Sequence, residues 1–409
     1  MSKLKTNTIR HVDGSNDNIT LDSSQNVTVE GNATVDGTST LTGNVTCSGQ
    51  LKADALRHTG ASSDAVTLAS DGTCTAKITN NLSNRNLIIN GAMQIAQRGT
   101  SSTAEGIKTV DRWSYSATSS EVFNTSQHAL TSSDTGPWEK GFRHSWHFEN
   151  GNQGTIAATS YIQPQLKIEA QDIATSGWNI ADANSKITLS YWIKSSVEQE
   201  FWGFVETGDA PDWMYVFGTG TLSANTWKKV TVTIPGNSNL TVNNDNGLGL
   251  LVVPWTVWGS DYTTSGRGTG WLAYASGNRT PDADASWWQT NDATIEVTGG
   301  QLEVGDVATD FEHRSYGDEL ARCQRYFYKE HVTDSIGPYF TQYYHSHKFV
   351  HMWYPVTMRT VPTPTVTYNT GSPTAYKLTT NHFKAYVASA YDDSSNTYYI
   401  SAAQFDAEL

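Results

Sequence analysis

A hexad repeat near the N-terminus constrains the fold of this chain of 409 residues more than any other feature. Residues 26–49 divide into four consecutive hexads, with the sequences NVTVEG, NATVDG, TSTLTG and NVTCSG. Position three is always threonine, position four is always apolar and position six is always glycine. Alternate residues of an extended strand share one face, and glycine suits a corner where the chain turns. The repeat therefore predicts short strands with one apolar stripe along one side.

Repeats of this kind indicate a stacked β architecture. A β-helix formed by one chain would use roughly three such hexads for a single coil, so this tract cannot bury a core alone. Three copies wound together would bury it, each supplying one wall, which predicts an intertwined homotrimeric shaft over residues 26–85. We expect the trimer contacts to come from Val27, Val29, Val35, Leu41, Val45 and Cys47. A flexible polar linker is the alternative, but a linker has no need of an apolar stripe.

The aromatic residues mark a domain boundary near residue 85. The first 85 residues contain no Trp, Tyr or Phe, whereas all 14 tryptophans lie between Trp113 and Trp353. Before this boundary, Ala65–Leu68 and Cys74–Ile78 flank an Asp-Gly pair, which is typical of two strands joined by a turn.

The composition excludes several classes of protein. Charged residues make up only 16% of the chain and its formal net charge is −13, so nucleic acid is not an expected partner. The longest apolar run, Leu248–Pro254, is too short to cross a bilayer, and no N-terminal apolar segment typical of a secretory signal is present. The three cysteines are Cys47, Cys74 and Cys323. Their odd number and wide spacing predict small buried side chains rather than disulfides or a zinc site.

Residues 86–315 alternate short β-type runs with turns. The runs are Leu87–Ile89, Lys186–Ile193, Trp227–Ile234, Gly247–Val253 and Thr294–Val297. Their spacing, with almost no helical period, predicts a two-sheet β-sandwich of jelly-roll type. The longest stretch without a strand pattern runs from Pro254 to Asn291.

The last region, residues 316–409, is predicted to hold a helix followed by strands. Apolar residues recur three or four positions apart at Tyr316, Leu320, Cys323 and Phe327. With acidic residues in the first turn, this pattern predicts a helix over 315–329. Strand-type segments follow, including a run over Tyr339–Tyr354. The chain is therefore expected to be mainly β, with a repeat shaft, a central jelly roll and a β-rich C-terminal module with one short helix.

Several motifs resemble those of tailed-bacteriophage tail fibre proteins, especially fibres of marine and cyanobacterial phages. In chain order they are LKTNTI (4–9), NLIING (86–91), QRG (97–99), DRW (111–113), QLEVG (301–305), ATDFE (308–312), ELARCQRYF (319–327) and PVTMR (355–359). The first resembles the N-terminal end of such fibres. The next five resemble the opening and closing segments of the carbohydrate-binding-module-like jelly roll that these proteins often carry. The last two resemble the C-terminal module that follows it.

The resemblance implies a homotrimeric virion component of the phage tail, assembled in the host cytoplasm. Residues 1–25 would attach it to the phage tail or to an adaptor protein, and the jelly roll and C-terminal module would bind host surface polysaccharide. No motif matches a catalytic residue, so the chain is not expected to be an enzyme or to need a cofactor. A polysaccharide depolymerase tailspike and a head or capsid fibre of the same architecture are the alternatives.

The segment between Pro254 and Asn291 is the candidate sugar-binding region. It sets many aromatic residues among Gly, Ser, Thr and Asp. Flat aromatic rings can pack on the apolar face of a pyranose while polar side chains bind its hydroxyls. The candidate residues are Trp255, Trp258, Tyr262, Trp271, Trp287, Trp288, Arg267 and Asp284. The alternative is that these rings fill the sandwich core or a trimer interface.

Three smaller motifs are interpreted as structural. Glu206, Asp209 and Asp212 are neighbours on one turn-rich stretch, whereas a glycosidase needs two carboxylates at a set separation across a cleft. A solvated loop or a structural cation site is the simpler interpretation, so no catalytic residue is predicted. Asp111–Trp113 is interpreted as an Arg–carboxylate pair beside an aromatic ring.

A histidine pair at His345 and His347 is the candidate metal-binding motif. Alternation in a strand places both imidazoles on one face, and three chains around a threefold axis would offer enough nitrogens for an octahedral transition metal. The motif resembles iron sites of some phage fibres. Two surface histidines are the simpler interpretation, so no metal is predicted.

Overall fold

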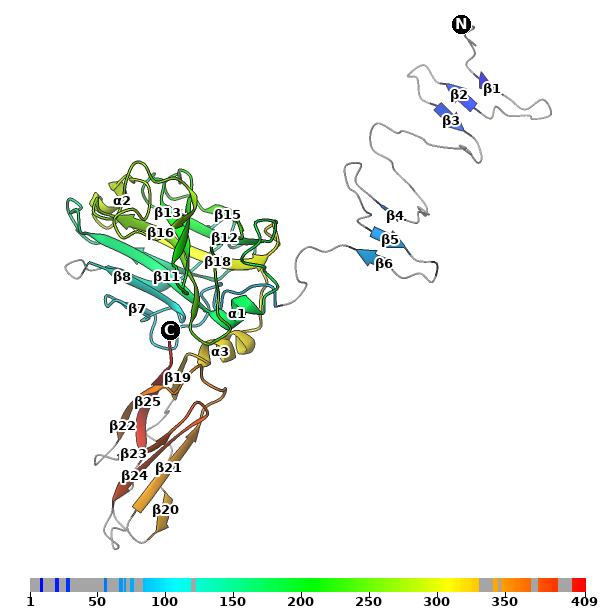
Figure 1. Cartoon of the computed structure of the whole chain (residues 1–409). Helices are drawn as coiled ribbons and strands as arrows, with labels where there is room; N and C mark the ends of the chain where they lie inside the picture. The colour runs from blue at the N-terminus through cyan, green and yellow to red at the C-terminus, as the bar shows by residue number, and fades with distance from the viewer. Residues whose placement is uncertain are drawn as a thin grey trace. The chain divides into compact units, whose positions relative to one another are not determined.

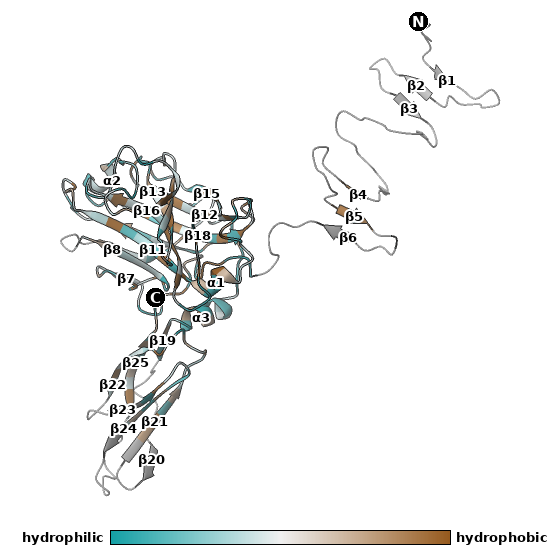
Figure 2. Ribbon diagram, in the orientation of Figure 1, coloured by the Kyte–Doolittle hydropathy of each residue, from teal (hydrophilic) through white to brown (hydrophobic). Residues whose placement is uncertain are grey.

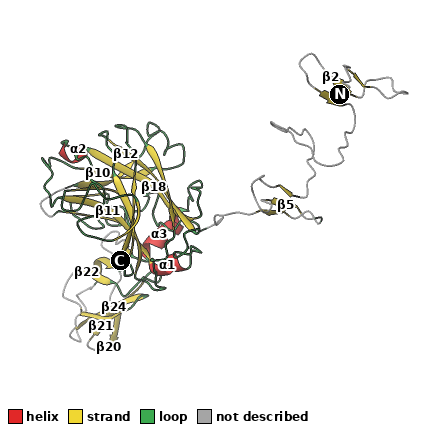
Figure 3. Cartoon of the chain, turned by 45° about the horizontal axis from the view of Figure 1, so that its top comes forward, coloured by secondary structure: helices red, strands yellow, loops and turns green. Residues whose placement is uncertain are grey.

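The computed structural model describes residues 84–118, 123–330, 341–344, 347–368, 374–388 and 399–409, together with short segments of the first 83 residues. It divides the chain into two compact units, Met1–Lys77 and Ile78–Leu409, which we describe separately. Among the described residues strands predominate, and the helices are few and short (Figure 3). This confirms the mainly β fold class. No helix among these residues is long and apolar enough to cross a membrane.

The described part of the first unit contains two small antiparallel sheets. One joins β1 (Thr8–Ile9), β2 (Ile19–Leu21) and β3 (Val27–Val29), and the other joins β4 (Ala55–Leu56), β5 (Val66–Leu68) and β6 (Cys74–Ala76). The pairing of β5 with β6 confirms the strand–turn–strand unit expected before the boundary. The side chains of the six predicted trimer-contact residues lie outside the described residues, so those contacts stay a prediction.

The second unit contains a sandwich of two six-stranded antiparallel sheets (Figure 1). The first sheet has the order β15 (Lys228–Pro235), β12 (Lys186–Ser195), β18 (Thr294–Val304), β10 (His144–Glu149), β9 (Asn124–Ala129) and β7 (Ser101–Ser102). The second has the order β17 (Gly270–Ala273), β14 (Trp213–Gly218), β13 (Trp202–Thr207), β16 (Leu248–Trp258), β11 (Tyr161–Glu169) and β8 (Trp113–Ala117). Two short helices, α1 (Ala170–Ala174) and α2 (Ser286–Gln289), lie in the connections. The predicted jelly-roll sandwich is therefore present.

The core lies between the two sheets and is strongly aromatic. Figure 2 shows hydrophobic residues on sandwich strands such as β12 and β16. Phe148 of the first sheet packs against Trp255 of the second with ring centroids 5.2 Å apart. The hydroxyl of Tyr191 crosses the core to donate to the carbonyl of Pro254 at 2.6 Å, so the buried polar group is satisfied.

Some predicted element boundaries need correction. Leu87–Ile89 is not a strand; Ile88 is fully buried there, and the amide of Leu87 donates to the carbonyl of Leu302. The stretch from Pro254 to Asn291 is not featureless, because β16 continues to Trp258 and both β17 and α2 lie within it. Apolar character alone identified these segments, and it does not separate a strand from a buried loop.

The C-terminal module begins with α3 (Tyr316–Gln324), which is capped by the side chain of Ser315 and is shorter than predicted. It ends early because the chain turns into β19 (Phe327–Glu330), which joins β25 (Ile400–Asp406) and β22 (Thr363–Tyr368) in a three-stranded sheet. A second sheet joins β20 (Thr341–Tyr344), β21 (His347–Trp353), β24 (His382–Ala388) and β23 (Thr374–Leu378). The expected run over Tyr339–Tyr354 is thus two antiparallel strands rather than one.

Ionic contacts hold this module against the sandwich. The carboxylate of Glu169, fully buried at the end of β11, accepts from Arg325 at 2.9 and 2.8 Å and from the hydroxyl of Tyr326 at 2.5 Å. Arg112 pairs with Glu408 and lies 3.4 Å above the ring of Tyr326. Arg112 thus forms an Arg–carboxylate pair beside an aromatic ring, but its partner is the side chain of Glu408, whereas Asp111 lies 3.8 Å from Arg98. Cys323 is buried without a disulfide, as expected.

Candidate functional site

The outer surface of the first sheet, which we call the polar face, carries polar and aromatic side chains. On β12, Tyr191 and Ile193 point into the core, so Trp192 and Lys194 lie on the outside. The same alternation on β18 places Glu296 outside between two core residues. A strand with one face in the core leaves the other for different chemistry.

A hollow of about 530 Å³ opens on the polar face. Its apolar part consists of Trp192, Phe142 and Phe311, with the rings of the two phenylalanines 4.8 Å apart and nearly perpendicular. Charged and polar residues complete the lining: Glu139, Lys140, Ser190, Lys229, Asp310 and His313. Aromatic surface surrounded by a few polar groups is the usual composition of a small-ligand site.

Two glycines fix the position of the Trp192 ring. Both have positive φ, 97° at Gly136 and 66° at Gly299. A Cβ atom at Gly136 would lie 2.7 Å from Cζ3 of Trp192, and one at Gly299 would lie 3.1 Å from its Cδ1 and 2.7 Å from Cζ of Phe142. Only glycine combines this backbone conformation with such a close approach. The indole is therefore held in a defined orientation while remaining partly exposed.

An ion-pair network continues along the same face. The ammonium of Lys194 lies 2.9 Å from both Asp134 and Glu296, and Asp134 also accepts from the indole N–H of Trp227 at 3.0 Å. Burial pushes the pKa of Glu296 upward, but polar contacts with His147 and Ser145 and the charge of Lys194 outweigh it and hold the pKa well below its usual range. Glu296 is therefore ionised at neutral pH.

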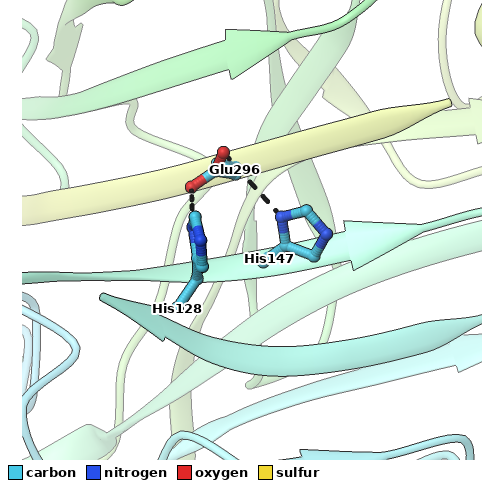
Figure 4. A group of neighbouring side chains, drawn as sticks. All are labelled: His128, His147 and Glu296. Carbon is cyan, nitrogen blue, oxygen red and sulfur yellow. Dashed lines mark hydrogen bonds and ion pairs between the residues drawn. The ribbon is translucent and has the colours of Figure 1, made fainter. Parts of the chain in front are cut away.

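Two histidines lie beside Glu296, as Figure 4 shows. Nδ1 of His128, on β9, is 3.1 Å from Oε2 of Glu296, and Nδ1 of His147, on β10, is 3.8 Å from Oε1. The hydroxyl of Ser145 donates to Oε2 at 2.5 Å. The three side chains come from adjacent strands, so the sheet itself sets their spacing.

Four of the five predicted sugar-binding tryptophans are buried, which corrects that part of the prediction. Trp255, Trp287 and Trp288 are at most 1% exposed, and Trp258 is 5% exposed. Trp255 and Trp287 pack together between the sheets with centroids 5.3 Å apart. A sugar cannot stack on rings that the protein already covers on both sides.

The remaining members of that set do not form one surface. Arg267 is buried and donates to the carbonyl of Arg279 at 3.2 Å. Asp284 is exposed, but its carboxylate accepts from the amide and hydroxyl of Ser286 at the start of α2. Tyr262 and Trp271 are partly exposed. Trp271 packs on Tyr215 and donates to the carbonyl of Pro235, whereas Tyr262 packs on Trp258.

The outer surface of the second sheet, which we call the apolar face, is covered. Its residues form a buried cluster of Phe204, Met214, Val216, Leu251, Val253 and Trp258. Tyr262 packs against this cluster, and the guanidinium of Arg279 lies 5.2 Å from the ring centroids of Trp258 and Tyr262. Tyr262 and Arg279 of the Trp-rich segment (residues 254–291) thus cover part of this face.

The predicted acidic and histidine motifs do not form a paired site among the described residues. Glu206 lies on the apolar face, where burial and then the charge of Asp212 raise its pKa to about 7. Asp209 accepts from the backbone amide of Asn243 at 2.8 Å. His345 and the side chain of His347 lie outside the described residues, so neither interpretation of that motif is tested.

Sequence reasoning missed the residues of the hollow. For Trp192 a signal was present. Alternate residues of its strand, Ile187, Leu189, Tyr191 and Ile193, face the core, and Trp192 lies among the polar residues that alternate with them. A large aromatic in the polar phase of a half-buried strand is a candidate contact residue. Phe142, Phe311 and His313 lie in turns and loops, and no periodicity identifies them.

No protein-family model and no curated protein matches the sequence. Among solved structures, the enzymatically active domain of bacteriophage CBA120 tailspike protein 4 matches 54% of this chain and 21% of its own length, at 10% identity and TM-score 0.29. The N-terminal cellulose-binding domain of Cellulomonas fimi β-1,4-glucanase C matches 53% of this chain and 99% of its own length, at 11% identity and TM-score 0.26.

The family 11 carbohydrate-binding module of a Clostridium thermocellum cellulosomal cellulase matches 53% of this chain and 98% of its own length, at 13% identity and TM-score 0.23. With TM-scores of 0.29 or lower, these matches support no statement about this chain. The function of this chain is therefore argued from its own side chains.

Proposed function

We propose that this chain is a carbohydrate-binding protein whose sugar site is the hollow on the polar face. The observation that carries the proposal is the partly exposed Trp192 ring, fixed by Gly136 and Gly299 inside a rim of charged side chains. An oriented indole offers a flat apolar surface for a pyranose ring, and the rim offers hydrogen-bond partners for its hydroxyls. Pre-orientation lowers the entropy lost when a flexible sugar binds.

The test compares a tryptophan of the first sheet with one of the second sheet, Trp271, which packs against the core cluster. Trp192→Ala should weaken glycan binding roughly ten-fold, because aromatic contacts contribute about 0.5–1.5 kcal/mol beyond buried area and about 1.4 kcal/mol corresponds to a factor of ten. Trp271→Ala removes a partly exposed tryptophan of the other sheet and should leave binding unchanged. A glycan array identifies the ligand for the intact protein, and titration calorimetry then measures each variant.

The outcomes separate the possible sites. Thermal melting must first establish that both variants fold. Loss of binding in Trp271→Ala alone would move the site to the Trp-rich segment predicted from the sequence. A wild-type protein that binds no polysaccharide would contradict the proposal itself.

The finer proposal is a homotrimeric tail fibre of a tailed-phage virion, assembled in the host cytoplasm and attached through residues 1–25, with host surface polysaccharide as its ligand. The phage-fibre motifs and the hexads of residues 26–49 support it. The purified chain should have the solution mass of three copies. A stable monomer in which residues 26–49 are well folded would contradict the shaft.

Binding is favoured over hydrolysis at the hollow because both of its carboxylates have partners. Glu139 accepts from the amide of Gly136, and Asp310 lies 3.3 Å from the ammonium of Lys140. A glycosidase needs one carboxyl group that protonates the leaving oxygen and a second that attacks or activates water. Release of reducing sugar from the bound polysaccharide would favour the depolymerase alternative.

A further inference from the structure

We propose that His128, His147 and Glu296 form a binding site for a transition-metal cation, with Zn²⁺ as the best match. The three residues lie on β9, β10 and β18, which are neighbours in the first sheet. In the strand register, His147 on β10 pairs with Glu296 on β18. His128 on β9 pairs with Ser145, which lies on β10 two residues before His147. Strand pairing therefore brings all three side chains to one spot on the polar face.

The spacing of the ligand atoms suits a small cation. One ligand atom from each residue lies within 4.8 Å of the other two. Ligands at about 2.0–2.2 Å from zinc in a tetrahedron are about 3.4 Å apart. The two His–Glu distances, 3.1 and 3.8 Å, lie on either side of that value, so small side-chain rotations are enough to close the site.

His147 supplies the second observation. Its Nδ1 atom is buried, and within the described part of the chain it has no hydrogen-bond partner, because Oε1 of Glu296 is 3.8 Å away. A buried polar atom without a partner costs free energy and is uncommon in folded proteins. A metal ion between His147 and Glu296 would satisfy both.

The neighbours of Glu296 are compatible with a bound cation. Lys194 lies 2.9 Å from Oε1 and would compete with the metal, but Asp134 lies equally close to this ammonium and can retain it. The hydroxyl of Ser145 donates to Oε2 and orients the carboxylate, as hydrogen-bonding partners of metal ligands commonly do.

The donor set identifies the class of metal. Two imidazoles and one carboxylate favour zinc or a similar transition metal over Ca²⁺ or Mg²⁺, which take mostly oxygen ligands. Three protein ligands leave a further position open. The side chain of His128 is 50% exposed, so solvent reaches this cluster.

The experiment titrates the intact, chelator-treated protein with ZnCl₂ by calorimetry and with CoCl₂ by visible absorption. The wild type should bind saturably and give the absorption of tetrahedral cobalt. His147→Ala should weaken binding by at least roughly ten-fold, since loss of even an outer partner of a metal ligand costs that much. His128→Gln changes the more exposed ligand and gives the same test in a variant with little risk of misfolding.

His313→Ala is the matched control, because it removes an exposed histidine of the hollow and should leave zinc binding unchanged. Equal zinc affinity in the wild type and both ligand variants, or no saturable binding, would overturn the proposal. The site does not depend on sugar binding: Trp192→Ala should keep zinc affinity, and His147→Ala should keep glycan affinity, so the two proposals can fail separately.

Discussion

The two outer faces of the sandwich belong to sheets of equal strand number, yet they carry opposite kinds of side chains. The apolar face presents Phe204, Met214 and Leu251, and Trp258 and Tyr262 pack over it. The polar face presents Trp192, Lys194 and Glu296 beside a hollow. The first face adds to the stability of the fold, whereas the second leaves oriented side chains available for ligands.

The difference between the two faces is visible in the residue pattern of the strands. Every residue of β16 after Leu248 is buried, which occurs when both sides of a strand are covered. On β12, the polar phase carries Thr188, Ser190 and Lys194. An uninterrupted apolar run therefore indicates that other side chains pack on the outside of the sheet, and here Tyr262 of the Trp-rich segment does so. Its aromatic content reflects packing.

The largest expected effect tests whether a tryptophan on the apolar face contributes more to stability than one on the polar face. Trp258→Ala should lower the free energy of unfolding by about 3–5 kcal/mol, because it empties a buried site in the apolar cluster. Trp192→Ala should lower it by clearly less, because that ring is partly exposed. Urea denaturation measures both. Equal losses would mean that Trp192 is a packing residue and would remove the contrast between the faces.

A smaller effect is expected in the pH dependence of stability, where one glutamate on each face has a shifted pKa. The pKa of Glu206 is raised to about 7 from the usual 4.5, so the folded state keeps a proton that the unfolded chain has released. Stability should therefore fall as pH rises from 4.5 to 7 through this group. Glu206→Gln should flatten that fall, measured as urea midpoints across the range.

Glu296 should act with the opposite sign. Its pKa is lowered in the folded state, so its contribution is present above the unfolded value of 4.5 and is lost as pH falls below it. Glu296→Gln should remove the acid-side loss and leave the slope between pH 4.5 and 7 unchanged. Identical pH profiles for the two variants would show that the pKa values of the two carboxyl groups are not shifted in opposite directions.

Part of the fold follows from local pattern. The alternation in Lys186–Ile193 and Trp227–Ile234 predicted β12 and β15, and helical spacing with acidic residues in the first turn predicted α3. These elements depend on which residues alternate along the chain, and the sequence states that directly.

The sequence by itself determined the β class, the strand phases and the change in character near residue 85. Only the tertiary structure decided which aromatic rings a ligand can reach. Trp255 and Trp192 both lie in strands, but one meets Phe148 across the core and the other meets the hollow. At the rim of that hollow, Nε2 of His313 contacts the carbonyl of Lys140, although 173 positions of sequence separate the two residues. Exposure depends on what packs against a side chain, and long-range strand pairing sets those neighbours.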